Sequence, residues 1–393
     1  MSGMVIIGAG ECGVRAAFAL RMQGYAGEIT LIGAEAALPY ERPPLSKFGE
    51  TKPICAVEAY QDKAITLRLG EPVRGIDRAT RSVSLAGGET LDYDCLLLAT
   101  GARARLFPGM DGCLTLRTDK DAQSILSQLH RDARIGIVGG GFIGLELAAL
   151  ARSAGAEVTV FEAAPRLLGR AVPPQIAQVL QDRHLAEGVS MMLGTGVSSA
   201  NATRIVLADG KVLDFDAVIA GVGALPNTDL AETAGLDVQN GIVVDGDFRT
   251  SDPHVFAAGD CCNFDWRGQR VRLESWKAAK DQGEHAASAM LGQSDAYSKG
   301  PWFWSDQYDL GLQVTGIFDL AAPIRHRNTG GGTTVVFQID SVGTLRAAAG
   351  IGPMNTTSKD IRIFEKLIER GTAVDADALA DPEQNLKRLL KAA

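Results

Sequence analysis

The sequence predicts an α/β protein with two Rossmann-like dinucleotide-binding folds and a C-terminal α+β domain. Two observations lead to this prediction. A glycine-rich fingerprint that joins a strand to a helix occurs twice in the chain, and the strand pattern changes beyond Gly300. A length of 393 residues also exceeds what one ordinary hydrophobic core holds, so we expect two or three domains.

The first fingerprint lies at the beginning of the chain. The apolar run 4–7 ends in the pattern Gly8-Ala9-Gly10-Glu11-Cys12-Gly13. Its first glycine allows a tight turn, the second lets the backbone approach a pyrophosphate, and the third lets the helix pack on the strand. Glu35 ends the next strand, about 20 residues further on, where it would accept hydrogen bonds from a ribose. Glycines mark turns in any α/β protein, but strand, helix and acid together favour a dinucleotide site.

The second fingerprint repeats all of these features. The apolar run 135–138 leads into Gly139-Gly140-Gly141-Phe142-Ile143-Gly144, and a helical pattern follows. The next strand pattern, 158–161, again ends in an acid, Glu162. Because the fingerprint occurs twice, we expect one chain to bind two nucleotides.

Two further patterns would border the nucleotides. The segment 38–47 contains three prolines, so it predicts a rigid loop that leads into a short helix. This loop is either a plain surface turn or a wall that carries Arg42 and Lys47 to a cofactor. An apolar strand followed by a glycine turn occurs at 96–101 and again at 216–223, where it would reach the carboxyl edge of each sheet.

The last third of the chain begins with one more polar strand end and then changes in character. Asp260 follows an apolar strand and would either contact a cofactor or cap a helix. Beyond Gly300, antiparallel strands precede a helix that ends at Gly371, and a final helix is predicted from Pro382. The strands are expected at 310–315, 333–339 and 344–351, and the longer helix at 359–369.

Charge and hydropathy exclude two classes of partner. The formal net charge of −8 argues against nucleic acid, whose phosphates require a basic surface. No run of about 18 apolar residues is present, so we expect no membrane span. The sequence enters its first strand without a basic and apolar signal segment, which predicts a cytoplasmic protein.

The six cysteines form no metal or redox motif. Neither C-x-x-C nor C-x4-C occurs, and the neighbouring Cys261 and Cys262 would make a strained disulfide. We therefore expect structural or incidental thiols and no bound metal, as in a reduced compartment.

Together these stretches resemble the FAD-containing ferredoxin reductases of bacterial oxygenase systems, flavoproteins with a glutathione-reductase-like pair of dinucleotide folds. The segments Pro43-Pro44-Leu45-Ser46-Lys47 and 302–309 are distinctive of this family. Other matching stretches are 8–10, 98–101, 139–147, 221–227, 250–260 and 272–275.

The resemblance implies the domain order and the flavin site. The FAD-binding domain would be discontinuous, 1–108 and 229–298, the NAD-binding domain would be 109–228, and 299–393 would form the C-terminal domain. Lys47 would lie beside the reactive edge of the flavin, and Asp260 would hold its ribitol and pyrophosphate region. Trp276 departs from the smaller residue common at its position. The implied FAD-contacting residues are Gly8, Gly10, Cys12, Gly13, Glu35, Arg42, Lys47, Val73, Thr100, Gly101, Arg117, Gly259, Asp260 and Trp276.

For the second nucleotide, the acid Glu162 indicates NADH over NADPH, because it repels a 2′-phosphate. Ala163, which follows it, is not basic and agrees with this preference. By the resemblance, Glu146 points toward the nicotinamide and the flavin; the alternative is a solvated acid on a helix surface. The expected NAD-binding residues are Gly139, Gly141, Phe142, Ile143, Gly144, Glu146, Glu162 and Gly223.

The resemblance also implies the acceptor. Hydride would pass from NADH to FAD, with Lys47 and Glu146 as the catalytic residues, and electrons would leave singly to a [2Fe–2S] ferredoxin that supplies a Rieske or cytochrome P450 oxygenase. The chain has no four-cysteine cluster motif, so the cluster would belong to another protein. The expected docking residues are Lys277, Lys280, Trp304, Arg325 and Arg327, on a monomer or homodimer.

Three alternatives remain open at this point. The first is a rubredoxin in place of the ferredoxin. The second is a disulfide or peroxide reductase, which needs a reactive cysteine facing the flavin, whereas Cys55 stands alone beyond Pro43 and Pro44. The third is a redox sensor of the apoptosis-inducing-factor type, and the fold alone does not separate it from an enzyme.

Overall fold

The computed structural model describes residues 3–47, 51–293 and 296–392, and the chain divides into two compact units. Each unit is assembled from separate stretches of the sequence. Of the described residues, the first unit contains 3–43, 51–103, 224–293 and 296–299, and the second contains 44–47, 104–223 and 300–392.

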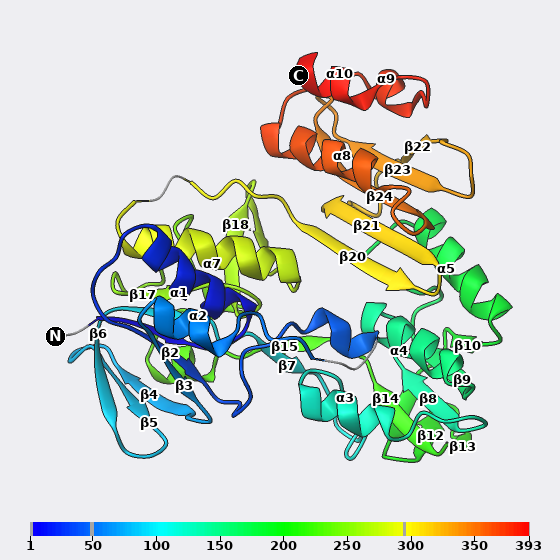
Figure 1. Cartoon of the computed structure of the whole chain (residues 1–393). Helices are drawn as coiled ribbons and strands as arrows, with labels where there is room; N and C mark the ends of the chain where they lie inside the picture. Colours follow the sequence, from blue (N-terminus) through cyan, green and yellow to red (C-terminus); the bar gives the residue numbers. More distant parts are fainter. Residues whose placement is uncertain (1–2, 48–50, 294–295, 393) are drawn as a thin grey trace. The chain divides into compact units, whose positions relative to one another are not determined.

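The first unit is organised around a seven-stranded sheet in the order β3-β2-β1-β6-β5-β4, with β17 paired to β6 (Figure 1). Strands β3, β2, β1, β6 and β17 run parallel, so their carboxyl ends lie at one edge of the sheet. The long β6 then continues into an antiparallel meander with β5 and β4. The bounds are β1 Gly3–Ile7, β2 Ile29–Gly33, β3 Ile65–Leu69, β4 Val73–Asp77, β5 Ser82–Leu85, β6 Thr90–Leu98 and β17 Val255–Ala257.

Helices α1 and α7 pack against each other beside this sheet. Their approach is so close that a Cβ on Gly283 would lie 2.3 Å from the carbonyl oxygen of Cys12. Small residues on both helices, such as Ala16 and Ala286, permit this contact. The remaining elements of the unit are shorter. The bounds are α1 Glu11–Met22, α2 Val57–Asp62, α6 Asp229–Thr233, α7 Trp276–Met290, β16 Ile242–Val243, β18 Cys262–Trp266 and β19 Gln269–Val271, and a 3₁₀ turn covers Pro43–Ser46.

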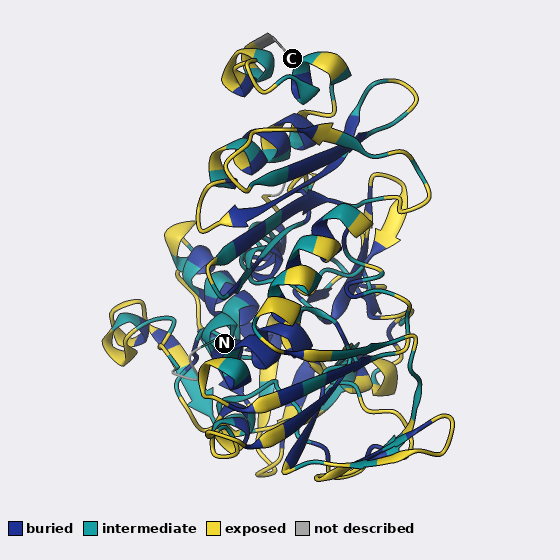
Figure 2. Cartoon of the chain, turned by 90° about the vertical axis from the view of Figure 1, so that its right-hand side faces the viewer, coloured by how far each residue is buried: buried dark blue, intermediate teal, exposed yellow. Residues whose placement is uncertain are grey.

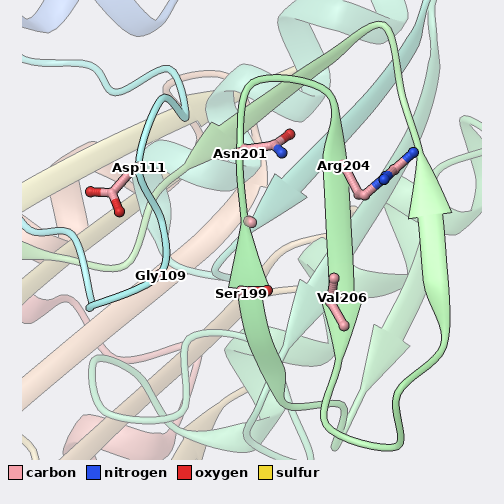
Figure 3. Close-up of a pocket in the computed structure, with 7 residues that line it drawn as sticks. Gly109, Asp111, Ser199, Asn201, Arg204 and Val206 are labelled. Carbon is pink, nitrogen blue, oxygen red and sulfur yellow. The ribbon is translucent and has the colours of Figure 1, made fainter.

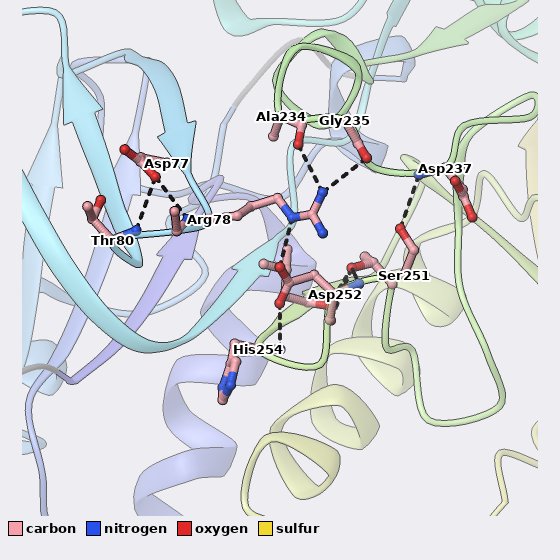
Figure 4. A network of polar contacts seen from close by, with 12 residues as sticks. Asp77, Arg78, Thr80, Ala234, Gly235, Asp237, Ser251, Asp252 and His254 are labelled. Atoms are coloured by element: carbon pink, nitrogen blue, oxygen red, sulfur yellow. Dashed lines mark hydrogen bonds and ion pairs between the residues drawn. The ribbon is translucent and has the colours of Figure 1, made fainter.

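Arg78 ties the separate stretches of the first unit together (Figure 4). Its Nε donates to the Asp252 carboxylate at 2.7 Å, and its Nη1 donates to the carbonyl oxygens of Ala234 and Gly235. Burial alone would raise the pKa of Asp252, but the hydrogen bonds from Arg78 and from the His254 N–H outweigh burial and lower it. The guanidinium therefore joins the β4–β5 turn to the chain after α6.

The second unit repeats the parallel arrangement in the order β10-β9-β8-β14, which corresponds to β3-β2-β1-β6 of the first unit. An antiparallel meander, β11-β12-β13, follows β10 along the chain. The strands are β8 Arg134–Val138, β9 Glu157–Glu162, β10 Ser190–Leu193, β11 Val197–Ala200, β12 Arg204–Leu207, β13 Val212–Asp214 and β14 Ala217–Ala220. The helices are α3 Asp119–Leu126, α4 Phe142–Ser153 and α5 Pro174–Ala186, and a two-stranded ribbon, β7 Ala102–Ala104 with β15 Ala224–Pro226, lies where the chain passes between units.

The C-terminal part of the second unit is an antiparallel sheet in the order β20-β21-β24-β23-β22. It contains the three predicted antiparallel strands, as β21, β23 and β24, and adds β20 and β22, which were not predicted. Its strands are mainly buried, and α8 covers them with Phe364 and Leu367 while exposing its other side (Figure 2). The bounds are β20 Trp302–Gln307, β21 Leu310–Gly316, β22 Arg325–Arg327, β23 Thr334–Ile339, β24 Leu345–Pro353, α8 Ser358–Arg370, α9 Ala376–Ala380 and α10 Leu386–Ala392.

The final helix begins later than predicted. It starts at Leu386, because the Asn385 side chain accepts a hydrogen bond from the Lys387 N–H, as an N-cap does, while Pro382 lies in the preceding turn. The longer helix α8 ends at Gly371, which has φ +66° as expected for its C-terminal glycine.

One hydrophobic core joins the second parallel sheet's helices to the C-terminal sheet. Leu145 of α4 and Leu180 of α5 belong to the same buried cluster as Leu312 and Ala349 of the antiparallel sheet. The two predicted parts of the second unit therefore share a core, and their exact boundary stays a prediction.

Replacing Arg78 with Met should lower the free energy of unfolding by about 1–2 kcal/mol near neutral pH, because it removes a charged hydrogen bond from the nearly buried Asp252. The folded pKa of Asp252 is depressed, so its contribution is present above the unfolded pKa of about 3.9 and is lost as the pH falls through the folded value. The difference between wild type and variant in urea unfolding should therefore shrink toward about pH 3. Arg204→Met, which breaks an exposed pair with Asp214, is the matched control and should change stability by under about 1 kcal/mol; equal losses in both variants would contradict the role of Arg78.

Candidate active site

The first fingerprint brings strand, turn and helix into direct backbone contact. Gly8 has φ +114°, and a Cβ on it would lie 2.1 Å from the carbonyl oxygen of Ala99 at the end of β6. A Cβ on Gly13 would lie 1.9 Å from the carbonyl oxygen of Gly8. No side chain fits at either position, so both glycines are required by the approach of β1, β6 and α1.

The second fingerprint reproduces this geometry in the second unit. Gly139 has φ +109°, and a Cβ on it would lie 2.3 Å from the carbonyl oxygen of Gly221. A Cβ on Gly144 would lie 2.2 Å from the carbonyl oxygen of Gly139. The residue after β14 therefore touches the second glycine turn in the same way as the residue after β6 touches the first.

The middle glycine of each fingerprint instead faces open space. A Cβ on Gly10 would meet no atom within 4 Å, and one on Gly141 would meet its nearest neighbour at 3.9 Å. Gly10 and Gly141 are the N-cap residues of α1 and α4, and neither helix start has a side-chain cap. Uncapped N–H groups, the positive end of the helix dipole and free space together fit a pyrophosphate in each unit.

The acid at the end of each second strand is held in place by short hydrogen bonds. Glu35 accepts from the Tyr40 hydroxyl at 2.6 Å and from Arg42 at 2.7 Å. Glu162 accepts from the N–H groups of Gly140 and Ala164, each at 2.8 Å. Arg42 thus lies beside the first acid, and Tyr40 is a partner that the sequence did not single out. Whether the loop forms a wall of a cofactor site stays a prediction.

Two further strand ends of the first unit are fixed by polar contacts. The Thr100 hydroxyl donates to the Asn227 carbonyl at 2.7 Å, and the Asn227 side-chain amide donates back to the Thr100 carbonyl at 2.9 Å. The Gly259 N–H donates to the buried Gln282 side chain at 2.8 Å, a residue that sequence reasoning missed. Asp260 lies in the turn between β17 and β18, so the alternative that it caps a helix is wrong, because a strand begins at Cys262.

A half-buried acid, Glu11, lies in the first turn of α1. Glu11 accepts from Arg15 at 2.7 Å, and burial raises its pKa although that hydrogen bond and the Arg15 charge oppose the shift. A negative side chain in the first turn interacts favourably with the positive end of the helix dipole. It also lies close to the open space in front of Gly10, where a pyrophosphate would bring further negative charge.

Glu146, which the sequence left as either a functional or a solvated acid, is 6% exposed and lies in α4. The Ser46 hydroxyl donates to its Oε2, while Ser305 at 2.6 Å and Lys47 at 3.2 Å donate to its Oε1. The solvated-surface alternative is therefore wrong. The Lys47 ammonium also lies 5.6 Å from the ring centroid of Trp304, so both predicted catalytic residues meet in one buried cluster of the second unit.

The other predicted cofactor residues lie at the edges of the two folds. Cys12 is buried beside Gly259, Val73 begins β4, and Gly101 has φ +68° just after β6. Trp276 begins α7, and Arg117 precedes α3 with its N–H bonded to Asp121. In the second unit, Phe142 packs edge-to-face on Phe303, Ile143 is exposed, and Gly223 has φ +112° with free space around it.

The predicted docking residues differ in accessibility. Lys277 pairs with Asp281 at 2.5 Å on α7, Lys280 lies 5.9 Å from the Trp276 ring, and Arg325 pairs with Asp377. Arg327 is 5% exposed, pairs with Asp360 and donates to carbonyl oxygens of the α9–α10 segment, so its prediction as a docking residue is wrong. Its charge is paired with Asp360 inside the C-terminal domain.

The cysteines are free thiols in buried or partly buried surroundings. All six are free, and burial raises the pKa of each one, including Cys55. A raised pKa leaves little thiolate at neutral pH, which disfavours redox chemistry at these sites. Among the described residues, no group of three or more His, Cys, Asp or Glu side chains is arranged to hold a metal ion.

A separate pocket of about 230 Å³ lies beside the β11–β12 turn of the second unit, where Asn201 and Arg204 border it (Figure 3). Asp111 approaches it from the segment before α3. It is lined by none of the predicted site residues.

The duplicated glycine cradle, one on each parallel sheet, defines a two-dinucleotide oxidoreductase. Comparison with protein families agrees. Residues 2–283 match the pyridine nucleotide-disulphide oxidoreductase family, and residues 302–390 match the reductase C-terminal family.

The curated relatives include reductase components of dioxygenase systems and a putidaredoxin reductase. The chain is 41% identical to the anthranilate 1,2-dioxygenase system ferredoxin–NAD(+) reductase component of Burkholderia cepacia, over 98% of both chains. It is 39% identical to putidaredoxin reductase CamA of Pseudomonas putida over 80% of each. Among solved structures, the covalent putidaredoxin reductase–putidaredoxin complex matches with a TM-score of 0.92, 34% identity and coverage of 100% of this chain and 99% of that one.

The chain therefore belongs to the ferredoxin–NAD(+) reductases, FAD-dependent oxidoreductases that use NADH. This confirms the family, fold class and cofactors expected from the motifs. In the part of the chain that the structure describes, no helix is long and apolar enough to cross a bilayer.

Replacing Gly139 with Ala should raise the KM for NADH by at least about tenfold while the FAD content stays at that of wild type. The new Cβ would meet the backbone of Gly221 at a φ that L-residues rarely adopt, and neither can give way. FAD is measured by absorbance after denaturation, and KM with a small electron acceptor. The control is Gly87→Ala, where a Cβ meets no atom within 4 Å; an unchanged KM in Gly139→Ala would contradict the second cradle.

Proposed function

We propose that this chain is the reductase component of an oxygenase system, which oxidises NADH and passes the electrons through FAD, one at a time, to a [2Fe–2S] ferredoxin. The observation that carries this proposal is the duplicated cradle, because a reductase of this kind needs one resident nucleotide and one that exchanges. The domain division predicted from the sequence, with the FAD domain at 1–108 and 229–298, is part of the proposal.

The first cradle holds FAD in this proposal. The N–H groups at Gly10 bind the pyrophosphate, and Glu35 binds the ribose of the adenosine half. Thr100 and Asp260, at the ends of β6 and β17, lie along the same sheet edge and suit contacts to the rest of the cofactor. The second cradle binds NADH at Gly141 in the same way, with Glu162 on the ribose.

The half-buried Lys47 and the buried Glu146 provide the charges at the reacting end of the site. FAD, when bound, would supply the chemistry that links a two-electron donor, NADH, to a one-electron acceptor, the ferredoxin. Lys47 favours negative charge on its neighbour in the active site, and Glu146 favours the positive charge that the nicotinamide acquires. Their 3.2 Å pair lets each hold the other in position before the substrate enters.

The acceptor is proposed from the relatives' partners. The solved relative is joined to putidaredoxin, and the Burkholderia cepacia relative serves a dioxygenase system. A rubredoxin acceptor, the identity of the oxygenase, the oligomeric state and a cytoplasmic location stay predictions. The raised pKa values of the thiols support the ferredoxin acceptor over disulfide or peroxide chemistry.

An anaerobic titration tests the proposal. The purified protein is titrated with NADH, an oxidised [2Fe–2S] ferredoxin is then added, and the absorbance of both is recorded. Bleaching of the flavin followed by bleaching of the ferredoxin, repeated over many turnovers, is expected. Flavin reduction without electron transfer to any ferredoxin or rubredoxin would contradict the proposed acceptor. The redox sensor and the disulfide or peroxide reductase would then be the favoured functions.

Glu162→Gln should raise kcat/KM for NADPH and lower the NADH/NADPH preference by about 10- to 100-fold, the range that loss of one charged interaction gives. The amide removes repulsion of the 2′-phosphate but keeps one oxygen for the Gly140 N–H. Steady-state kinetics with both cofactors measure this change. An unchanged ratio of kcat/KM for NADH and NADPH would show that Glu162 does not contact the ribose.

Lys280→Glu should slow ferredoxin reduction and leave the reduction of a small dye unchanged, because complementary charge steers protein association. The rate should fall by about tenfold at low salt, and by less at high salt. Lys211→Glu, an exposed position in the other unit, is the matched control. Equal effects of both variants, or an effect on the dye, would contradict docking near α7.

A further inference from the structure

A buried chain of polar side chains leads from helix α5 through strand β20 to Glu146, all within the second unit. The Tyr308 hydroxyl is 3.0 Å from His184 Nδ1, and His184 Nε2 is 2.8 Å from Gln307 Oε1. Gln307 Nε2 is 3.0 Å from the Ser305 hydroxyl, which donates to Glu146 at 2.6 Å. His184, Gln307 and Ser305 are each at most 1% exposed.

Every donor in this chain points toward Glu146. The Gln307 Oε1 can only accept, so the His184 proton is on Nε2, and Nδ1 of the neutral ring accepts from Tyr308. Burial lowers the pKa of His184, which keeps the ring neutral, although its hydrogen bond to Gln307 opposes the shift. The Gln307 amide then has its N–H groups directed at Ser305, and the Ser305 hydroxyl is left to donate to Glu146.

The outer end of the chain is held in a strained conformation. Tyr308 has φ +55° in the turn between β20 and β21, a region that bulky residues rarely adopt. Its ring packs edge-to-face on His184 at 5.0 Å, and the Arg183 guanidinium lies 4.8 Å from the ring centroid. Contacts from α5 thus fix the turn that directly follows β20, the strand that carries Gln307 and Ser305.

The chain cannot carry a proton from Glu146 to Tyr308, because the Gln307 amide in its middle does not exchange protons in relay. Its effect is therefore on position. Glu146 itself makes only one, rather long, contact to Lys47, so its two serine partners decide where the carboxylate points.

We propose that His184 and Gln307 are positioning residues for hydride transfer, which orient the Ser305 hydroxyl and through it hold the Glu146 carboxylate toward the nicotinamide site. This inference rests on the proposed role of Glu146. It assigns the C-terminal domain a part in the NADH half-reaction, because β20 supplies two members of the chain.

The test compares Gln307→Met with Gln338→Met in the FAD-loaded protein. Gln338 is equally buried in the same antiparallel sheet, and its amide bonds to Asp319 and Ala322, away from Glu146. Both variants lose buried hydrogen bonds, so a general loss of stability affects both. The rate constant of flavin reduction at saturating NADH is measured by anaerobic stopped flow, and crystal structures of both variants record the Glu146 carboxylate.

In Gln307→Met, the limiting rate constant should fall by about 10- to 100-fold, with a smaller change in the half-saturating NADH concentration, and the carboxylate should leave Ser305. In Gln338→Met both should stay as in wild type. A wild-type rate in Gln307→Met, an equal loss in Gln338→Met, or a loss with the carboxylate unmoved would overturn the inference. The variant Glu146→Gln distinguishes failure of the proposed function from failure of this inference. If Glu146→Gln reduces the flavin at the wild-type rate, the proposed role of Glu146 is wrong. If Glu146→Gln is slow and Gln307→Met is not, only the positioning role of His184 and Gln307 is wrong.

Discussion

The constraint on which the rest of this molecule depends is a backbone contact that occurs twice. At Gly8 and at Gly139, the turn after the first strand touches the end of a neighbouring parallel strand so closely that a Cβ would lie 2.1 or 2.3 Å from a carbonyl oxygen. The close contact brings the uncapped start of α1 or α4 to the sheet edge, where the N–H groups and the helix dipole meet open space. This geometry is the basis on which both nucleotide sites are proposed.

The second organising feature is a buried carboxylate whose hydrogen-bond donors come from segments far apart in the sequence. Glu146 on α4 meets Lys47 from the proline-rich loop and Ser305 from the antiparallel sheet. A charge that is removed from water requires such partners, because an unpaired one would be costly. The shared hydrophobic core between α4, α5 and that sheet holds these partners in register.

The sequence predicted what depends on local spacing. The two fingerprints, the acids Glu35 and Glu162, the family and the fold class could all be identified, because glycine turns and strand-end acids form within about 30 residues. The surroundings of Glu146 could not, since Ser46, His184 and Ser305 come together only through tertiary packing. Local reasoning also offered a helix cap for Asp260, and that alternative is wrong because a strand follows, whereas its cofactor role stays a prediction. It was wrong for Arg327 as a docking residue, because that charge is neutralised inside its own domain.

Two equivalent cradles in one chain are expected to hold two different nucleotides, and a crystal structure of the FAD-loaded protein with NAD⁺ would show both at once. We expect the FAD pyrophosphate against the N–H groups that follow Gly10 at the start of α1, and the NAD⁺ pyrophosphate against those that follow Gly141 at the start of α4. Either nucleotide bound away from its cradle, or both found at the same one, would rule out this assignment of the two cradles.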